Sequence, residues 1–200
     1  ALAHAGGASV ICLGRPDADL KVDASLERAL DRHGPIAVIN AGGFTLVDKA
    51  EVEPDEARLL NVDGPRALAR ACSARGIPMI HLSTDCVFDG ESARPYRPDD
   101  APSPICIYGQ TKLDGELAVA EEFDCHLIVR VSWIFSRFGH NFVRTMLSLA
   151  RTRDRVSVVS DQVGCPTHAP ALASALLAMA RRVAEPGFDA WGTYHLAGRG

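Results

Sequence analysis

The feature that most restricts the fold of this chain is the alternation of short, continuously apolar runs with longer segments of helical periodicity. Such runs lack the in–out alternation of half-exposed strands, which is typical of strands buried on both faces of a parallel sheet. Because helical segments separate the runs, helices are expected to connect parallel strands, and the sequence predicts the doubly wound α/β class. The predicted strands are Ser9–Leu13, Ile36–Asn40, Met79–Ser83, His126–Val131, Val156–Val159 and Thr193–Ala197.

The helical segments carry recognisable end signals. Asp23 is expected to cap the first helix and Gly34 to end it. Pro54 suits the first turn of the second helix, which is expected to bend near Gly64-Pro65. Residues 88–104 contain four prolines and predict an irregular loop. The predicted helices are Asp23–His33, Pro54–Arg75, Ile107–Phe123, Asn141–Thr152 and Pro170–Val183.

Composition excludes several classes of function. The formal net charge is −4, from 21 Lys and Arg against 25 Asp and Glu, so no basic surface for nucleic acid is predicted. No apolar run approaches the roughly 20 residues of a membrane span, and no secretory leader opens the chain. The cysteines form no C-x-x-C pair and the histidines do not cluster, so neither a disulfide framework nor a metal site is predicted. Reduced cysteines favour a cytoplasmic location.

Tyr108 and Lys112 form the pattern Y-x-x-x-K, which places both side chains on one face of a helix. A phenol has an ordinary pKa of about 10, and a nearby ammonium lowers that pKa by stabilising the phenolate. Such a tyrosine can protonate a carbonyl oxygen as hydride reaches the carbon. The pattern is weak alone, because a pair on a helix surface has the same spacing.

Hydroxyl groups follow the predicted strand Met79–Ser83. Ser83 and Thr84 stand where this strand ends, and ligands of open α/β sheets bind outside the carboxyl ends of strands. A hydroxyl there can donate to an alkoxide that develops beside Tyr108. Alternatively, both hydroxyls bond only to backbone groups of the turn. Their combination with the Y-x-x-x-K pattern favours a catalytic site.

Six motifs in one order resemble those of the dTDP-4-dehydrorhamnose reductases, a family of extended short-chain dehydrogenases/reductases. The segment Asn40–Glu51 is similar to that family's N-A-A-x-T-x-V-D-x-A-E, and Asn61 follows in the next helix. The segment Ser83–Gly90 is similar to its S-T-D-Y-V-F-x-G, with Cys86 in place of the tyrosine. The matching segments are 40–51, 83–90, 108–116, 130–133, 139–142 and 161–167.

The resemblance implies reduction of the 4-keto group of dTDP-4-dehydro-L-rhamnose to dTDP-L-rhamnose by an NAD(P)H-dependent oxidoreductase. It implies that Tyr108 is the proton donor, that Lys112 tunes Tyr108 and holds the nicotinamide ribose, and that Thr84 bonds the substrate carbonyl oxygen. Asp85 is then expected on the sugar side of the site.

Two further residues are expected at the substrate. The resemblance implies that Trp133 lines the nucleotide-sugar site, although a core tryptophan after a strand is the alternative. Asn141 and residues 161–167 are expected to shape the substrate side, or else to cap a helix and form a turn.

A Rossmann-like, NAD(P)-binding domain is implied over residues 1–200, with parts of the substrate-binding lobe from about residue 130. No G-x-G-x-x-G or G-x-x-G-x-x-G turn occurs in the sequence, although such a turn normally holds the pyrophosphate. We therefore expect the first strand and this turn to be missing through truncation or disorder. The C-terminal remainder of the substrate lobe is expected to be missing as well.

The cofactor is expected to be NADP(H) or NAD(H). Arg15, near the end of the strand Ser9–Leu13, can accommodate a 2′-phosphate and slightly favours NADP(H), unless it is simply a solvated loop charge. Glycines after a strand permit close approach of a dinucleotide, or serve a plain turn. Mg²⁺ is associated with some members of the family, but no ligands for it can be located. The expected cofactor-binding residues are Asp19, Leu20, Gly42, Gly43, Phe44, Thr45, Tyr108 and Lys112.

Other functions stay open on the sequence alone. A non-catalytic, NADP-binding regulatory subunit resembling the β subunit of methionine adenosyltransferase has the same fold, but the joint presence of Thr84, Tyr108 and Lys112 argues against a decayed site. An epimerase or dehydratase of the extended short-chain class is a further alternative. Cys86 after Asp85 disfavours a dehydratase, which commonly has an Asp-Glu pair there. The sequence leaves open a homodimer and the identity of the sugar nucleotide.

Overall fold

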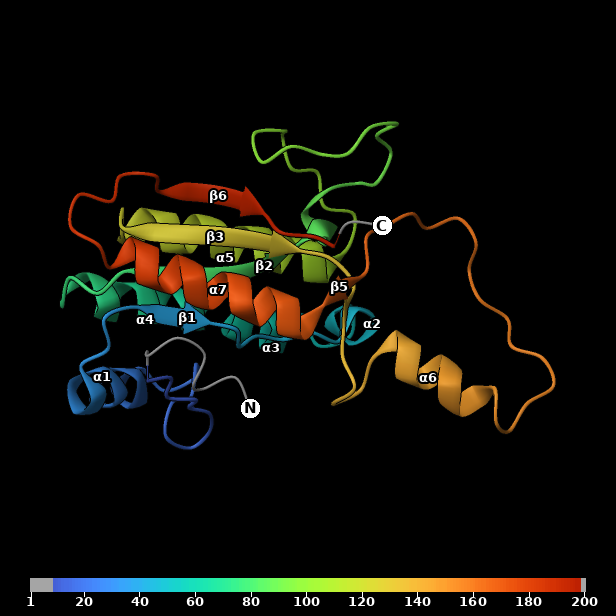
Figure 1. The fold of residues 1–200 in the computed structure, drawn as a ribbon, viewed down its shortest axis with the longest axis horizontal. Helices are drawn as coiled ribbons and strands as arrows, with labels where there is room; N and C mark the ends of the chain where they lie inside the picture. Colours follow the sequence, from blue (N-terminus) through green and yellow to red (C-terminus); the bar gives the residue numbers. More distant parts are fainter. Residues whose placement is uncertain (1–8, 199–200) are drawn as a thin grey trace.

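Residues 9–198 are described by the computed structural model of this chain. Their central feature is a parallel sheet with the strand order β1-β2-β3-β6 (Figure 1). Its register places Ser83, Arg130 and His195 side by side across β2, β3 and β6. The predicted α/β class with a parallel sheet is confirmed. The strands are β1 (Val38–Asn40), β2 (Met79–Thr84), β3 (His126–Val131) and β6 (Gly192–His195).

Helices connect the strands along the described part of the chain. They are α1 (Asp23–His33), α2 (Val47–Ala50), α3 (Pro54–Arg58), α4 (Gly64–Ser73), α5 (Ile107–Glu122), α6 (Phe142–Leu149) and α7 (Ala169–Val183). A π-helical turn (Leu59–Asp63) joins α3 to α4, and a 3-10 turn (Asp85–Val87) follows β2. A separate small ladder pairs β4 (Ile134–Phe135) with β5 (Thr167–His168).

Both faces of the sheet are apolar and both are covered by helices, as continuous apolar strands require. Figure 1 shows α7 on one face and α5 on the other. The core on the side of α1, α4 and α5 consists of Leu26, Leu30, Leu68, Ala69, Ala71, Cys72, Met79, Val119 and Ile128. The core on the side of α7 consists of Ile80, Leu127, Val129, Val131, Leu172, Leu176 and Val183.

The first helix has the predicted bounds, Asp23–His33, but not the predicted cap. Gly34 ends it in the left-handed conformation, with φ of 49°, and donates its N–H to the carbonyl of Leu30 at 2.9 Å. The prediction that Asp23 is the N-cap is wrong, since Val22 occupies that position without a side-chain bond. Asp23 instead lies in the first turn, where its negative charge is favourable to the helix dipole.

Two predicted strands do not form in the described residues. A strand needs a neighbour that accepts and donates its backbone hydrogen bonds, and Ser9–Leu13 pairs with no strand of the described residues. Ile11 is accordingly 53% exposed. The segment Val156–Val159 likewise pairs with no strand, and Val159 is 67% exposed.

The helix α6 lies apart from the sheet (Figure 1). None of its residues is buried, and Phe142 and Leu147 are 62% and 60% exposed. In the part of the chain that the structure describes, no helix combines the length and the apolar character that crossing a membrane would require.

Candidate active site

The candidate site lies at the carboxyl edge of the sheet, where α5 meets the end of β2. Thr84 is the last residue of β2, and its hydroxyl caps the following 3-10 turn by accepting a hydrogen bond from the Cys86 amide at 3.2 Å. The Cys106 thiol caps α5 by accepting from the Gly109 amide at 3.3 Å. Gly109 permits close approach, because a Cβ there would lie 2.1 Å from the Cys86 carbonyl oxygen. The first turn of α5 therefore brings Tyr108 against the end of β2.

The phenol of Tyr108 is largely buried and protonated. Burial raises its pKa to about 12, while a hydrogen-bonding interaction with Thr84 acts in the opposite direction. Thr84 itself donates to Asp85 Oδ1 at 3.1 Å, and burial also raises the pKa of Asp85. The site thus presents a neutral phenol and an oriented hydroxyl, which is the pair a carbonyl reduction requires.

Lys112 lies one turn further along α5 and is only 5% exposed. Its Nζ donates to the carbonyl oxygen of Leu82 at 2.7 Å. Burial lowers the pKa of this ammonium to about 8, and the charge of Glu116 opposes that shift. The sequence predicts that Lys112 lowers the pKa of Tyr108, but in this structure burial raises that pKa, and the interaction that opposes the rise comes from Thr84.

Asn61, in the π-helical turn, ties the loop after β1 to α5. Its Oδ1 accepts from the Phe44 amide at 2.8 Å, and its Nδ2 donates to the Phe44 carbonyl at 3.2 Å and to Thr111 Oγ1 at 3.1 Å. A Cβ on Gly43 would lie 2.8 Å from Asn61 Oδ1 and 4.0 Å from Lys112 Nζ. Glycine at 43 therefore keeps this loop close to Lys112.

The predicted cofactor-binding residues fall into two groups. Leu20 covers Gly42, where a Cβ would lie 3.1 Å from Leu20 Cδ1, so these two residues meet. Thr45 is exposed after the same loop. The side chain of Phe44 is buried against Ala50 and Ala57, and both of its backbone groups bond to Asn61.

Asp19 has local partners of its own. Its Oδ1 accepts from the Lys21 amide at 3.0 Å, and its backbone amide donates to Ser25 Oγ at 2.9 Å. Arg15 is exposed in the segment that precedes α1.

The predicted substrate-side residues Trp133 and Asn141 differ in whether their side chains are already hydrogen-bonded within the chain. Trp133 follows β3 with a left-handed φ of 42°, which is unusual for a bulky residue and typical of functional sites. It is 48% exposed, and its ring covers Gly164, where a Cβ would lie 2.6 Å from the ring. Asn141 is engaged as the N-cap of α6: its Oδ1 accepts from the Arg144 amide at 3.1 Å and its Nδ2 donates to the Ser136 carbonyl at 2.8 Å.

The residue types alone do not reveal the role of His81, which is completely buried in β2. Asn40 Oδ1 accepts from the Gly42 amide, so the NH₂ end of the same amide donates to His81 Nδ1 at 3.0 Å. The ring proton is therefore on Nε2, which has no partner among the described residues. Burial, together with the charge of Lys112, holds the pKa of His81 well below 6.5.

We expect the free energy of unfolding to fall as the pH drops below about 6.5, the ordinary pKa of histidine. The pKa of His81 is depressed in the folded state, so its contribution to the free energy of unfolding is fully present above pH 6.5. Below about pH 6.5 the unfolded chain takes up the proton on this histidine, while the folded chain does not until its lower pKa is reached. The slope approaches about 1.4 kcal/mol per pH unit. Urea titrations over this range measure it. His81→Gln, which cannot titrate, should flatten the dependence, and an unchanged slope would contradict the assignment.

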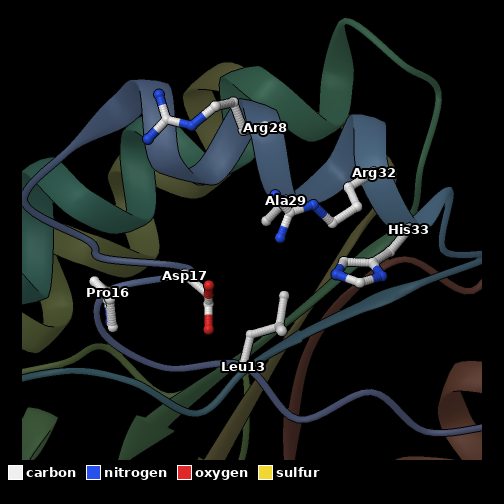
Figure 2. Close-up of a pocket in the computed structure, with 7 residues that line it drawn as sticks. All are labelled: Leu13, Pro16, Asp17, Arg28, Ala29, Arg32 and His33. Carbon is white, nitrogen blue, oxygen red and sulfur yellow. The ribbon is translucent and has the colours of Figure 1, made fainter.

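A small pocket of about 90 Å³ is formed by α1 and the segment before it (Figure 2). Arg28, Arg32 and His33 of α1 line it together with Asp17. It contains none of the candidate catalytic side chains. Across residues 9–198, no three His, Cys, Asp or Glu side chains are arranged to hold a metal ion.

Comparisons with known proteins show the family to which this chain belongs. The profile of a family described as RmlD substrate binding domain matches residues 1–200. A protein named dTDP-4-dehydrorhamnose reductase from Sinorhizobium fredii is 45% identical over 192 residues, which cover 96% of this chain and 65% of that protein. This chain therefore spans less than two thirds of that relative's length.

Solved structures give the same result. A dTDP-4-dehydrorhamnose reductase from Bacillus anthracis in complex with NADP superposes with a TM-score of 0.90 at 32% identity, over 96% of this chain and 66% of that one. An orthologue from Clostridium acetobutylicum also gives a TM-score of 0.90, at 35% identity, over 98% of this chain and 68% of that one.

A parallel sheet of this kind, with Thr84, Tyr108 and Lys112 at its carboxyl edge, defines a Rossmann-like protein of the extended short-chain dehydrogenase/reductase class. Within this class, the chain belongs to the RmlD substrate binding domain family, and the resemblance to dTDP-4-dehydrorhamnose reductases is confirmed.

Proposed function

We propose that the complete protein reduces the 4-keto group of dTDP-4-dehydro-L-rhamnose with a nicotinamide cofactor. The observation that carries this proposal is the protonated phenol of Tyr108 beside the Thr84 hydroxyl, with Lys112 one turn away. Relatives at 45% and 43% identity bear the name of this activity.

The residues of the chain supply the proton and the orientation. Thr84 holds the carbonyl oxygen by a hydrogen bond, and Tyr108 gives its proton to that oxygen as the alkoxide develops. The bound nicotinamide supplies the hydride to the carbonyl carbon. Since burial keeps the pKa of Tyr108 at about 12, the phenol enters the reaction in its donor form.

The site suits a dinucleotide. An ammonium has three N–H donors, and Lys112 Nζ uses one of them within the described residues, on Leu82 at 2.7 Å. The remaining donors are available to ribose hydroxyls, and Gly42 and Gly43 leave the backbone open beside them. We propose Asp19 and Leu20 for the adenine side, with Phe44 and Thr45 as further cofactor contacts after β1, and Arg15 favours NADP(H).

The substrate side is proposed to include Asp85 and Trp133, with the segment after residue 130 forming part of the substrate-binding lobe. The strained backbone and exposed ring of Trp133 support this assignment. Asn141 would act there through the helix α6 that it caps. The cysteines are all free in the structure, which supports a cytoplasmic location.

The proposal is tested with the complete protein and enzymatically prepared dTDP-4-dehydro-L-rhamnose, by following the loss of nicotinamide absorbance with NADPH and with NADH. Turnover with formation of dTDP-L-rhamnose is expected. Binding of NADPH without turnover would favour a regulatory subunit, and turnover with a different keto sugar alone would correct the substrate.

A further inference from the structure

Glu116 and Arg130 form a buried ion pair below the candidate site. Arg130 Nε donates to Glu116 Oε1 at 2.9 Å, and Arg130 Nη2 donates to Oε2 at 2.7 Å, so the two groups meet through paired hydrogen bonds. The two side chains are 7% and 6% exposed. Neither the proposed proton transfer nor the proposed cofactor contacts use this pair.

Further contacts hold the Arg130 guanidinium of this pair in place. The guanidinium of Arg130 lies over the ring of Phe88, 5.1 Å from its centroid, and its Nη1 donates to the Pro98 carbonyl at 3.4 Å. Phe88 is stacked on Tyr96 with 4.3 Å between ring centroids. These contacts leave the carboxylate of Glu116 little freedom to turn away from α5.

Glu116 follows Lys112 by four residues, so the two side chains are neighbours on the buried face of α5. No carboxylate bonds to Lys112 Nζ in the described residues, where its partner is the Leu82 carbonyl. Among the described residues, Glu116 is the acidic group whose charge acts on the Lys112 ammonium, and this charge opposes the lowering of the Lys112 pKa by burial.

The other titratable groups around Lys112 do not supply a negative charge that would keep its ammonium protonated. On β2, His81 is buried and neutral, because its pKa lies well below 6.5. On β6, His195 faces the ion pair, and burial lowers its pKa too. At the start of α5, Tyr108 is protonated, and the charge of Asp85 acts on that phenol.

We propose that Glu116, held by Arg130, is a positioning residue that keeps Lys112 charged in the dry interior of the site. The catalytic role of this positioning rests on the proposed function, but the charge of Lys112 can be measured without turnover. A charged Nζ offers three donors, whereas a neutral amine offers two and a lone pair. Without Glu116, burial would be unopposed and Lys112 would lose its proton closer to neutral pH.

The test is an NMR titration of the complete protein labelled with ¹³C at lysine Cε, with Lys112 assigned from Lys112→Arg. Elsewhere in this chain only Lys21 and Lys49 contribute signals, and both are exposed. Lys112 should titrate at about 8 in the natural protein and about one pH unit or more lower in Glu116→Gln. An unchanged midpoint would overturn the proposal.

Three further variants separate the charge effect from misfolding. Glu116→Gln leaves Arg130 unpaired, so Glu116→Gln with Arg130→Met removes both charges and should lower the midpoint as well. Glu116→Asp retains the negative charge, so the titration midpoint of Lys112 should stay close to that of the natural protein. Glu121→Gln is the matched control on α5, since Glu121 is exposed and paired with Arg66.

Turnover distinguishes this inference from the proposed function. In Glu116→Gln, the alkaline loss of kcat should occur at a lower pH, parallel to the NMR midpoint. A shifted midpoint in a protein without any reductase activity would support the charge role and overturn the proposed function. Reductase activity with an unshifted midpoint would overturn the charge role alone.

Discussion

Tyr108→Phe is expected to lower kcat of the proposed reduction by about two to four orders of magnitude, with little change in KM for the sugar nucleotide. The variant keeps the ring that packs against the cluster of Phe44, Ala50 and Ala57 but lacks the proton that the alkoxide needs. Because the pKa of Tyr108 is raised to about 12, no other form of this side chain contributes at neutral pH. Steady-state oxidation of NADPH measures the effect.

Tyr194→Phe is the matched control, because that hydroxyl donates to the Ala190 carbonyl at 2.7 Å and takes no part in the site. It should retain turnover within about twofold, the size expected of a surface change. If Tyr108→Phe kept the natural kcat, another group would have to donate the proton, and the proposed mechanism would be wrong.

Gly115→Ala is expected to destabilise the fold by about 3 kcal/mol or more, at the upper end for overpacking. A Cβ at this position would lie 1.9 Å from the carbonyl oxygen of Asn61 and 3.1 Å from its carbonyl carbon, so backbone would have to move on both sides. The movement would separate α5 from the π-helical turn, and Lys112 from Gly43. Urea or thermal unfolding of the complete protein measures the loss.

The matched control is Gly14→Ala, where a Cβ would meet nothing within 4 Å. This variant should unfold within about 0.5 kcal/mol of the natural protein. Equal stability of Gly115→Ala and Gly14→Ala would show that α5 does not need to approach Asn61 as closely as described.

Helices were predictable where the signal is local. The bounds of α1 are predicted to the residue, because apolar periodicity and Gly34 act within the segment itself. The observed α5 (Ile107–Glu122) ends one residue before the predicted Phe123, within the ordinary uncertainty of helix ends.

Strands were predictable only where a partner exists. Met79–Ser83 and His126–Val131 form β2 and β3 because they pair with each other. Ser9–Leu13 has the same apolar character but no neighbour within the described residues, so composition alone could not decide its structure. The segment Val156–Val159 fails for the same reason.

The candidate site was predictable in its members but not in its electrostatics. The Y-x-x-x-K spacing and the end of β2 bring Thr84, Tyr108 and Lys112 to one edge. The direction of the pKa shift of Tyr108 depends on burial, which no local pattern encodes. Glu116 lies in one of the family's motifs and Asn61 follows another, yet the hydrogen bonds of both residues depend on partners far away in the sequence.

The π-helical turn Leu59–Asp63 has a consequence for how the length of this chain can change. A π turn accommodates one residue more than a regular helix, and each helical residue advances the side chains by about 100°. The extra residue is therefore taken up within the turn itself, and the helices on either side both bury a face, with Ala57 before the turn and Leu68 after it. Deleting one residue of this turn other than Asn61 would therefore produce a regular helix and leave the buried side of α4 facing the core. This turn is therefore a place where the chain can lose one residue without rotating α4, provided that Asn61 is kept.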